Sequence, residues 1–324
     1  MADISPAPNE PLAQARPMIL ARAVHKHYGA IQAVAGVDLE IGSGELFGLI
    51  GHNGAGKSTL FKMMLGLIPA SAGEIHIDGA LVGGGDFRAV RRKVGYLPEN
   101  VVLYDNLTGA ETLAFFARLK GVSAAGNAHL LDRVGLAHAA TRRVREYSKG
   151  MRQRLGFAQA LLGSPKILFL DEPTTGLDPE AIRGFYAILR ELRSEGVTTV
   201  ITSHILAEIQ ERVDRLAIMA AGKVQATGTV QGLREQMKLP LTIVARLAPG
   251  AIETVRSRLA ELVPGGMVGS DGVRDGVRDG VLTLSCRRDD KMAVLAALLG
   301  LGAAVHDLSV HEPSLEDVFF GFSD

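Results

Sequence analysis

The chain has 324 residues, more than one compact core usually holds, so its length favours two domains. Lys plus Arg equals Asp plus Glu at 35 each, and this balance gives no reason to expect a nucleic acid or another strongly charged partner. The single cysteine, Cys286, excludes an internal disulfide framework and fits a reducing compartment. The longest uncharged apolar run, residues 292–305, is shorter than the ~20 residues that a membrane span needs.

The first part of the chain has the pattern of an α/β domain. Residues 1–17 lack the apolar core of a signal peptide and are predicted to be a disordered leader. From residue 18 to about 237, short apolar strands alternate with amphipathic helices, which predicts a largely parallel sheet with an antiparallel edge. Its strands include "ELFGLIG", "KILFL" and "VTTVITS", and "KSTLFKMMLGL" is predicted to be a helix. A helix-rich insert is expected at about 108–162, beginning with a capping box of Thr108 and Glu111.

Residues 241–324 are predicted to form a small α+β domain. The pattern predicts strands at 241–247, 281–286 and 304–310, helices at 251–262 and 291–299, and a last helix after Pro313. A tandem duplication, "GVRDGVRDGV", is predicted to be an expanded hairpin loop. We expect this domain to regulate the protein or to stabilise a dimer, the alternative being that it only packs against the first domain.

The stretch "GHNGAGKS" has the spacing of a phosphate-binding loop, G-x-x-x-x-G-K-[ST], between a predicted strand and a predicted helix. Its backbone N–H groups and the helix N-terminus would surround an anion, and Lys57 would reach the β- and γ-phosphates of a nucleotide. The hydroxyl of Ser58 is placed to bind Mg²⁺. The alternative is an ordinary glycine turn. The residues predicted to bind nucleotide here are Gly51, His52, Asn53, Gly54, Ala55, Gly56, Lys57, Ser58 and Thr59.

Two acidic residues follow the apolar strand in "ILFLDEP". Ligands of open α/β sheets bind at the carboxyl ends of the strands, which is where Asp171 and Glu172 emerge. We expect Asp171 to hold Mg²⁺ through water and Glu172 to orient and polarise an attacking water. The alternative is a strand that simply ends in a charged turn.

Two further residues are candidates for the same site. His204 closes the strand "TTVITSH", and its position favours a γ-phosphate sensor over a structural histidine. Tyr28 precedes the phosphate loop on a predicted antiparallel edge, where its ring could stack on adenine or, alternatively, pack in the core.

The stretch "EYSKGMRQRLG" has the features of only half a phosphate site. Ser148 opens a helix, Gly150 exposes its backbone, and Lys149 adds positive charge near the helix N-terminus. No metal-binding acid and no glycine run accompany them within the stretch. The stretch alone therefore leaves open whose phosphate it would hold.

In their order and spacing, these motifs resemble the ATP-binding subunits of ABC transporters over residues 18 to about 237. The resemblance implies ATP and Mg²⁺ as cofactors, ATP hydrolysis, and a head-to-tail pair of identical copies. Ser148, Lys149 and Gly150 would then cap the ATP bound by the second copy, and Asp178 in "GLDP" would lie at the interface between the copies.

Two departures from the family pattern point to one branch of it. The segment Tyr147–Met151 reads Tyr-Ser-Lys-Gly-Met where the family usually has Leu-Ser-Gly-Gly-Gln. Glu99 occupies the position of the usual glutamine and still offers oxygen to Mg²⁺ or its waters. Both departures resemble the branch whose membrane partners are of the ABC-2 type.

Within that branch, three segments resemble the ATPase of the nitrous oxide reductase maturation transporter, the NosF type: "GYLPENVVLYDNLTGAETLAFFARLKG", "VGLAHAATRRVREYSKGMRQRLGFAQALLG" and "HEPSLEDVF". This resemblance implies a NosY-like membrane subunit, a periplasmic NosD-like protein reached through it, and a location on the inner face of the cytoplasmic membrane. A different ABC-2-type exporter, for drugs, polysaccharides or lipids, is the main alternative. A GTPase would carry an Asn-Lys-x-Asp motif, which the sequence lacks, and ABC proteins of translation or DNA repair usually carry two cassettes or a long coiled coil.

Overall fold

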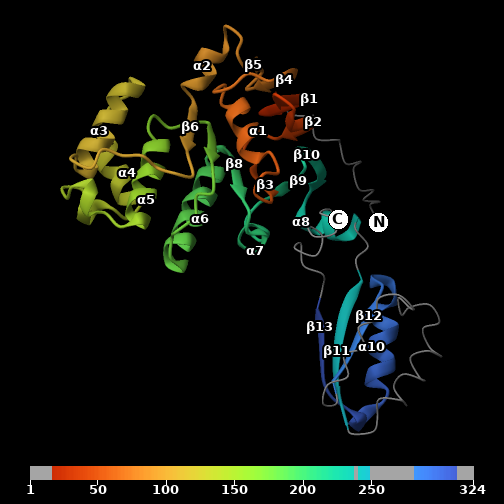
Figure 1. Cartoon of the computed structure of the whole chain (residues 1–324). Helices are drawn as coiled ribbons and strands as arrows, with labels where there is room; N and C mark the ends of the chain where they lie inside the picture. Colours follow the sequence, from red (N-terminus) through yellow and green to blue (C-terminus); the bar gives the residue numbers. More distant parts are fainter. Residues whose placement is uncertain (1–16, 237–239, 249–280, 312–324) are drawn as a thin grey trace, which may run out of the picture. The chain divides into compact units, whose positions relative to one another are not determined.

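The computed structural model describes residues 17–236, 240–248 and 281–311 (Figure 1). The chain divides into two compact units, the first ending at Gly228 and the second beginning at Thr229. No helix among the described residues is long and apolar enough to cross a bilayer.

A six-stranded sheet forms the centre of the first unit, with strand order β10-β9-β3-β8-β7-β6. All neighbours are parallel except β10, which runs antiparallel to β9. Every residue of β3, β7 and β8 is buried, as expected for parallel strands that are covered on both faces. The strand bounds are β3 (Leu46–Gly51), β6 (Val94–Leu97), β7 (Ile167–Leu170), β8 (Thr198–Ser203), β9 (Arg215–Ala220) and β10 (Lys223–Gly228).

A second sheet is antiparallel, with strand order β2-β1-β4-β5, which confirms the predicted antiparallel edge. Helix α1 (Lys57–Met64) packs against strands of both sheets, and its Phe61 ring meets the Phe169 ring edge-to-face at 5.4 Å. The helix ends at Met64, three residues before the predicted end at Leu67, and a left-handed Gly66 follows it. The other bounds are β1 (Ile19–Tyr28), β2 (Ile31–Ile41), β4 (Ala72–Ile77), β5 (Ala80–Leu81) and α2 (Phe87–Arg91).

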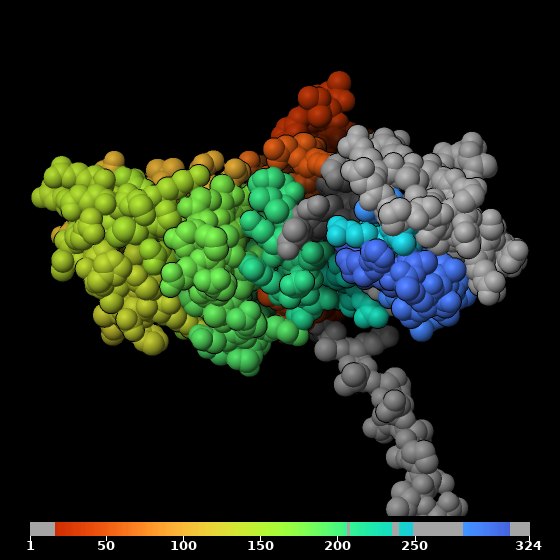
Figure 2. Space-filling model, turned by 90° about the horizontal axis from the view of Figure 1, so that it is seen from below, coloured from red at the N-terminus to blue at the C-terminus, as the bar shows by residue number. Residues whose placement is uncertain are grey.

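The helical insert lies between β6 and β7 in sequence and consists of α3 (Gly109–Lys120), α4 (Asn127–Arg133) and α5 (Lys149–Ala160). Its predicted capping box is confirmed, since Thr108 and Glu111 each accept a hydrogen bond from the other's backbone N–H. The insert lies on the opposite side of the six-stranded sheet from the antiparallel sheet (Figure 1). In the space-filling view it forms a lobe beside α6 (Pro179–Ser194), drawn in green (Figure 2). Helix α7 (Leu206–Ile209) follows β8.

The second unit contains α8 (Val230–Gln236), α10 (Lys291–Leu299) and an antiparallel sheet of order β12-β11-β13. Strands β11 (Leu241–Leu247) and β12 (Val281–Cys286) and helix α10 have the predicted bounds, and β13 (Val305–His311) is shifted by one residue. Alternate residues of β11 enter a core with Leu284 and Leu298. The predicted helix at 251–262, the duplicated loop and the last helix after Pro313 lie outside the described residues.

Candidate nucleotide site

The predicted phosphate loop connects β3 to α1 and curls around the side chain of Lys57. The Lys57 ammonium donates hydrogen bonds to the carbonyl oxygens of Gly51 and His52, at 3.2 Å for His52. Gly56 caps the helix with φ at 101°, and a Cβ there would lie 2.5 Å from the carbonyl oxygen of Ala33. Both the left-handed backbone and the close approach require glycine at this position.

Lys57 is a buried cation surrounded by carboxylates. Burial lowers the pKa of Lys57 below its usual 10.5, while the charges of Glu172, Asp171 and Glu99 act in the opposite direction and raise it. The side chain is therefore attracted to negative charge but has lost much of its water. A bound polyphosphate would supply the anionic partner that favours the charged form.

Asp171 and Glu172 follow β7 at its carboxyl end, as predicted. Both are nearly buried, at 6% and 9% exposure, and the backbone N–H of Asp171 donates to Leu97 of β6 at 2.8 Å. Glu172 has a left-handed backbone with φ at 46°, a conformation that costs a non-glycine residue about 1–2 kcal/mol. Such strain is concentrated at functional sites. Glu172 Oε2 lies 2.7 Å from Nδ1 of His204.

Thr202 is a residue of this site that the sequence reasoning missed. Its hydroxyl lies 2.6 Å from Asp171 Oδ1 and 2.9 Å from the backbone nitrogen of Glu172. Thr202 lies within the stretch "TTVITSH" of β8, but only His204 of that stretch is predicted to belong to the site, and the acidic pair follows a different strand, β7. The signal that could have found it is the pairing of these two strands, which aligns Leu170 with Ile201 and so brings Asp171 opposite Thr202.

A cavity of about 390 Å³ lies over the phosphate loop and collects most of the predicted site residues. Tyr28 is 48% exposed at its edge, so core packing of this ring is excluded, and the Lys26 ammonium lies 5.2 Å from the ring centroid. Gly51 and Asp171 are not among the lining residues, but each is the sequence neighbour of a residue that is, His52 and Glu172 respectively. The lining residues are Tyr28, Ala33, His52, Asn53, Gly54, Ala55, Gly56, Lys57, Ser58, Thr59, Glu99, Glu172 and His204.

The oxygen groups around this cavity suit Mg²⁺. No cluster of three or more His, Cys, Asp or Glu side chains that could hold a metal occurs in the described part of the chain. Mg²⁺ characteristically keeps several waters and takes one or two carboxylates plus phosphate oxygens. Burial raises the pKa of Tyr96 to about 12, with a smaller contribution from the negative charges of Asp171 and Glu99. Ser58, Glu99 and Asp171 are the candidate ligands.

The segment predicted to be half a site is built on helix N-termini. Ser148 caps α5 by accepting a hydrogen bond from the backbone of Met151 at 3.2 Å, which leaves its hydroxyl hydrogen able to donate elsewhere. Asp178 caps α6 in the same way, accepting from the backbone of Ala181 at 2.8 Å. Among the residues that line the nucleotide cavity, none comes from either cap.

The side chain of Lys149 lies against the loop that leads to Asp178. A Cβ built on Gly176 would be 2.8 Å from both Cδ and Cε of Lys149, so the lysine stem lies across this glycine. Gly176 has φ at 82°, a second position where the backbone requires glycine. Lys149 therefore connects the start of α5 with the loop before α6.

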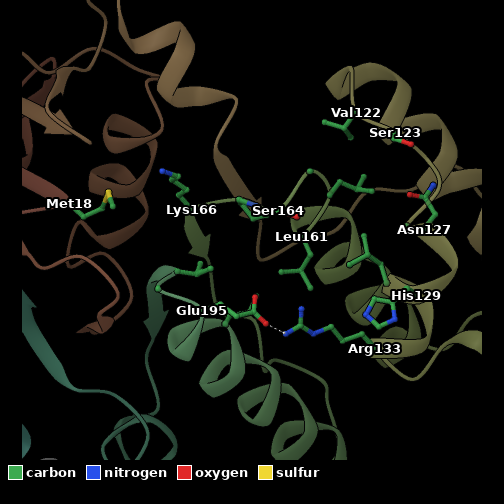
Figure 3. A pocket seen from close by; sticks show the side chains of 18 of the residues that line it. Met18, Val122, Ser123, Asn127, His129, Arg133, Leu161, Ser164, Lys166 and Glu195 are labelled. Atoms are coloured by element: carbon green, nitrogen blue, oxygen red, sulfur yellow. Dashed lines mark hydrogen bonds and ion pairs between the residues drawn. The ribbon is translucent and has the colours of Figure 1, made fainter.

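A larger cavity, of about 760 Å³, lies between α4 and the end of α6 (Figure 3). Arg133 of the insert crosses its edge and pairs with Glu191 at 3.2 Å and with Glu195 at 3.3 Å, both on α6. Its lining contains none of the predicted nucleotide-binding residues. The ion pairs connect the helical insert to the sheet-containing core of the first unit.

Comparison with known proteins agrees with this site. The family model described as "ABC transporter" matches residues 34–175. The linearmycin resistance ATP-binding protein LnrL of Bacillus subtilis is 31% identical over 94% of this chain and 98% of its own length. The daunorubicin resistance ATP-binding protein DrrA3 of Streptomyces coeruleorubidus is 33% identical over 91% of this chain and 92% of its own length. The lantibiotic transport ATP-binding protein SrtF of Streptococcus pyogenes is 38% identical over 64% of this chain and 89% of its own length.

Solved structures resemble the first unit in the same way. A structure of the ATP-binding subunit of an ABC transporter superimposes with a TM-score of 0.63 at 33% identity, covering 68% of this chain and 93% of that one. A dimeric structure of a bacterial ABC transporter cassette has a TM-score of 0.61 at 26% identity, and the match covers 66% of this chain and 99% of that one. The chain therefore belongs to the family of ABC transporter ATP-binding subunits, which are ATP-hydrolysing cassettes.

Proposed function

We propose that this chain hydrolyses ATP as a head-to-tail pair of copies and thereby drives a separate membrane subunit. The observation that carries the proposal is the convergence of Lys57, Glu99, Glu172 and His204 on one cavity at the carboxyl ends of neighbouring strands. A cation, two carboxylates and an imidazole around a phosphate loop are the groups that phosphoryl transfer needs.

Each side chain has a distinct role in this proposal. Lys57 and the loop amides hold the β- and γ-phosphates, and the exposed ring of Tyr28 stacks on adenine. Glu172 orients and polarises the attacking water, and His204 contacts the γ-phosphate. Mg²⁺, held by Ser58 and by Asp171 or Glu99 through water, would supply positive charge beside the phosphate oxygens.

The second copy supplies the remaining contacts. Ser148, Lys149 and the backbone of Gly150 would face the partner's γ-phosphate, with Asp178 at the interface. The dimeric state of the related bacterial cassette supports this pairing.

The test is Glu172→Gln, which keeps the shape of the side chain and removes its capacity to accept a proton. We expect ATP hydrolysis to slow by at least ~10² with ATP binding intact, and an ATP-dependent dimer to accumulate in light scattering. Hydrolysis at the wild-type rate by the variant in complex with its membrane subunit would refute the assignment of Glu172.

The cargo is proposed to be a compound exported through an ABC-2-type membrane subunit at the cytoplasmic membrane. The names of three relatives, for linearmycin resistance, daunorubicin resistance and lantibiotic transport, support export. Copper-site maturation of nitrous oxide reductase, with NosY-like and NosD-like partners, is the second candidate, favoured by the resemblance of the segments around Glu99 and near the chain end.

A gene deletion distinguishes these two cargoes. Loss of resistance to a drug, with normally metallated nitrous oxide reductase, supports export. A copper-deficient reductase with unchanged drug resistance supports maturation.

We propose that residues 18–237 form the nucleotide-binding domain and that residues 241–324, which follow it in the sequence, have a regulatory or dimer-stabilising role. The second unit has its own apolar core, so a chain ending at residue 240 should keep the nucleotide site. Light scattering of this truncated chain with ATP should show a weaker dimer. An unchanged dimer and an unchanged hydrolysis rate would argue against the role.

A further inference from the structure

Thr202 is a fully buried threonine, and both hydrogen bonds of its hydroxyl group go to the acidic pair. We propose that Thr202 is a positioning residue for ATP hydrolysis, which fixes the carboxylate of Asp171 and the backbone of Glu172 through one hydroxyl group. This inference rests on the proposed function, because the roles of Asp171 and Glu172 are assigned there.

The direction of the two hydrogen bonds follows from counting hydrogens. The backbone N–H of Glu172 can only donate, so the Thr202 oxygen accepts in that bond. The one hydroxyl hydrogen is then left for Asp171 Oδ1, at 2.6 Å, the length typical of a bond to an ionised carboxylate. Asp171 is thus held as an acceptor in one orientation, with Oδ2 left to face other ligands.

The register of the sheet makes this arrangement specific. Strands β7 and β8 are parallel, with Phe169 opposite Val200 and Leu170 opposite Ile201. One step further, Asp171 lies opposite Thr202, so the side chains of both project from the same face. On the other side of β7, the Asp171 backbone donates to Leu97 of β6. The candidate metal ligand is therefore fixed by both neighbouring strands.

The same hydroxyl stabilises the unusual backbone of Glu172. This residue has φ at 46°, directly after the regular strand, and its carboxylate lines the nucleotide cavity. Without the hydroxyl, the backbone N–H of Glu172 would lose its hydrogen-bond acceptor. The backbone of Glu172 could then leave the strained left-handed conformation. The carboxylate would then leave the position in which it meets His204.

Three variants test the proposal. Thr202→Val removes the hydroxyl at similar volume, and Thr202→Ser restores it. Thr198→Val is the matched control, because Thr198 is also fully buried on β8 and its hydroxyl also accepts a backbone bond, from Gly44 at 2.8 Å, but at the opposite end of the strand. We expect kcat of Thr202→Val to fall by ~10–100-fold, as for losses of groups that orient a metal ligand, with KM for ATP changed less than ~3-fold. The other two variants should stay within ~3-fold of wild type.

A second measurement does not depend on turnover. Calorimetry with a non-hydrolysable ATP analogue, in Mg²⁺ and in EDTA, gives the factor by which Mg²⁺ strengthens binding. We expect this factor to fall about 10-fold in Thr202→Val and to stay unchanged in Thr198→Val. Wild-type kcat and a wild-type Mg²⁺ factor in Thr202→Val would overturn the inference. Equal losses in Thr198→Val would also overturn it, by showing general damage to the strand.

Two further variants separate this inference from the proposed function. If Asp171→Asn and Glu172→Gln hydrolyse ATP at the wild-type rate, the assigned site is wrong, whatever Thr202→Val does. If both are inactive while Thr202→Val is fully active, only the role of Thr202 is wrong.

Discussion

His204 and Glu172 contact each other directly, with 2.7 Å between the imidazole Nδ1 and the carboxylate Oε2. The two residues follow neighbouring parallel strands, and the imidazole is far more exposed than the carboxylate. Glu172 is thus held through its backbone by Thr202 and through its side chain by His204. The arrangement leaves His204 at the cavity, where it could meet a γ-phosphate.

His204→Ala should therefore impair hydrolysis and spare binding. The variant loses both the orienting contact to Glu172 and a group beside the γ-phosphate, and the loss of one such transition-state contact costs roughly 10²-fold in kcat. Steady-state hydrolysis at saturating ATP measures the effect, with ATP affinity expected within ~3-fold of wild type. If affinity and kcat fall together, His204 contributes mainly to ground-state binding.

Nucleotide binding should take up protons at alkaline pH. Burial lowers the pKa of Lys57 in the free protein, so part of the ammonium is deprotonated at pH values somewhat below 10.5. Bound phosphates favour the charged form and raise this pKa again, so binding draws a proton from solution and ATP affinity falls as pH rises through that window. Calorimetry in two buffers of different ionisation enthalpy measures the uptake.

Lys57→Ala is the control for this proton uptake. It should lose ATP affinity because the main cation facing the phosphates is gone, and it should show no such proton uptake. If the variant binds ATP as tightly as wild type, the loop is not the phosphate site.

Ser148→Arg should spare ATP binding by a single copy but abolish the ATP-driven dimer. Ser148 lies outside the cavity lined by its own phosphate loop, and the arginine would fill the space of the partner's γ-phosphate. Mixed with Lys57→Ala, it gives a heterodimer with one intact composite site and one site broken in both halves, so one ATP should bind per dimer. A Ser148→Arg copy that cannot bind ATP on its own would instead indicate a role within one chain.

The membrane subunit should dock on the surface around Glu99 and the insert. The sequence places Tyr104, Leu107 and Phe116 in this region, and in the structure Tyr104 and Phe115 are exposed, with ring centroids 5.3 Å apart, while Leu107 and Phe116 are half-buried. An exposed aromatic cluster suits a helix-in-groove contact. Cysteines at 104 and 115 should crosslink to the membrane subunit. Crosslinks formed only through residues 281–311 would contradict this docking site.

Thr108→Ala should destabilise the first unit by about 1 kcal/mol, the typical cost of losing an N-cap. Thr108→Ser keeps the hydroxyl that accepts from Glu111 and should be close to neutral. Thermal unfolding measures both. Equal melting temperatures for alanine and wild type would show that the start of α3 is held by other contacts.

Much of this protein can be predicted from its sequence because the relevant signals are local. The phosphate loop, the capping box of Thr108 and Glu111, and the strands β11 and β12 each depend on residues close together in the chain. Short-range steric and hydrogen-bonding preferences determine such elements. The order of the motifs along the chain also indicates the protein family. The early end of α1 at Met64 shows the limit, since apolar residues continue to Leu67 but Gly66 turns left-handed.

How these pieces come together in one site depends on contacts between residues that are far apart in the chain. Asp171 and Thr202 are 31 positions apart, and only the parallel pairing of β7 with β8 places the hydroxyl on the carboxylate. The contact of Lys149 with Gly176 likewise depends on how α5 packs beside the loop before α6. Strand register and helix packing are set by burial of the whole apolar core, to which many distant residues contribute together. No local pattern in the sequence encodes them.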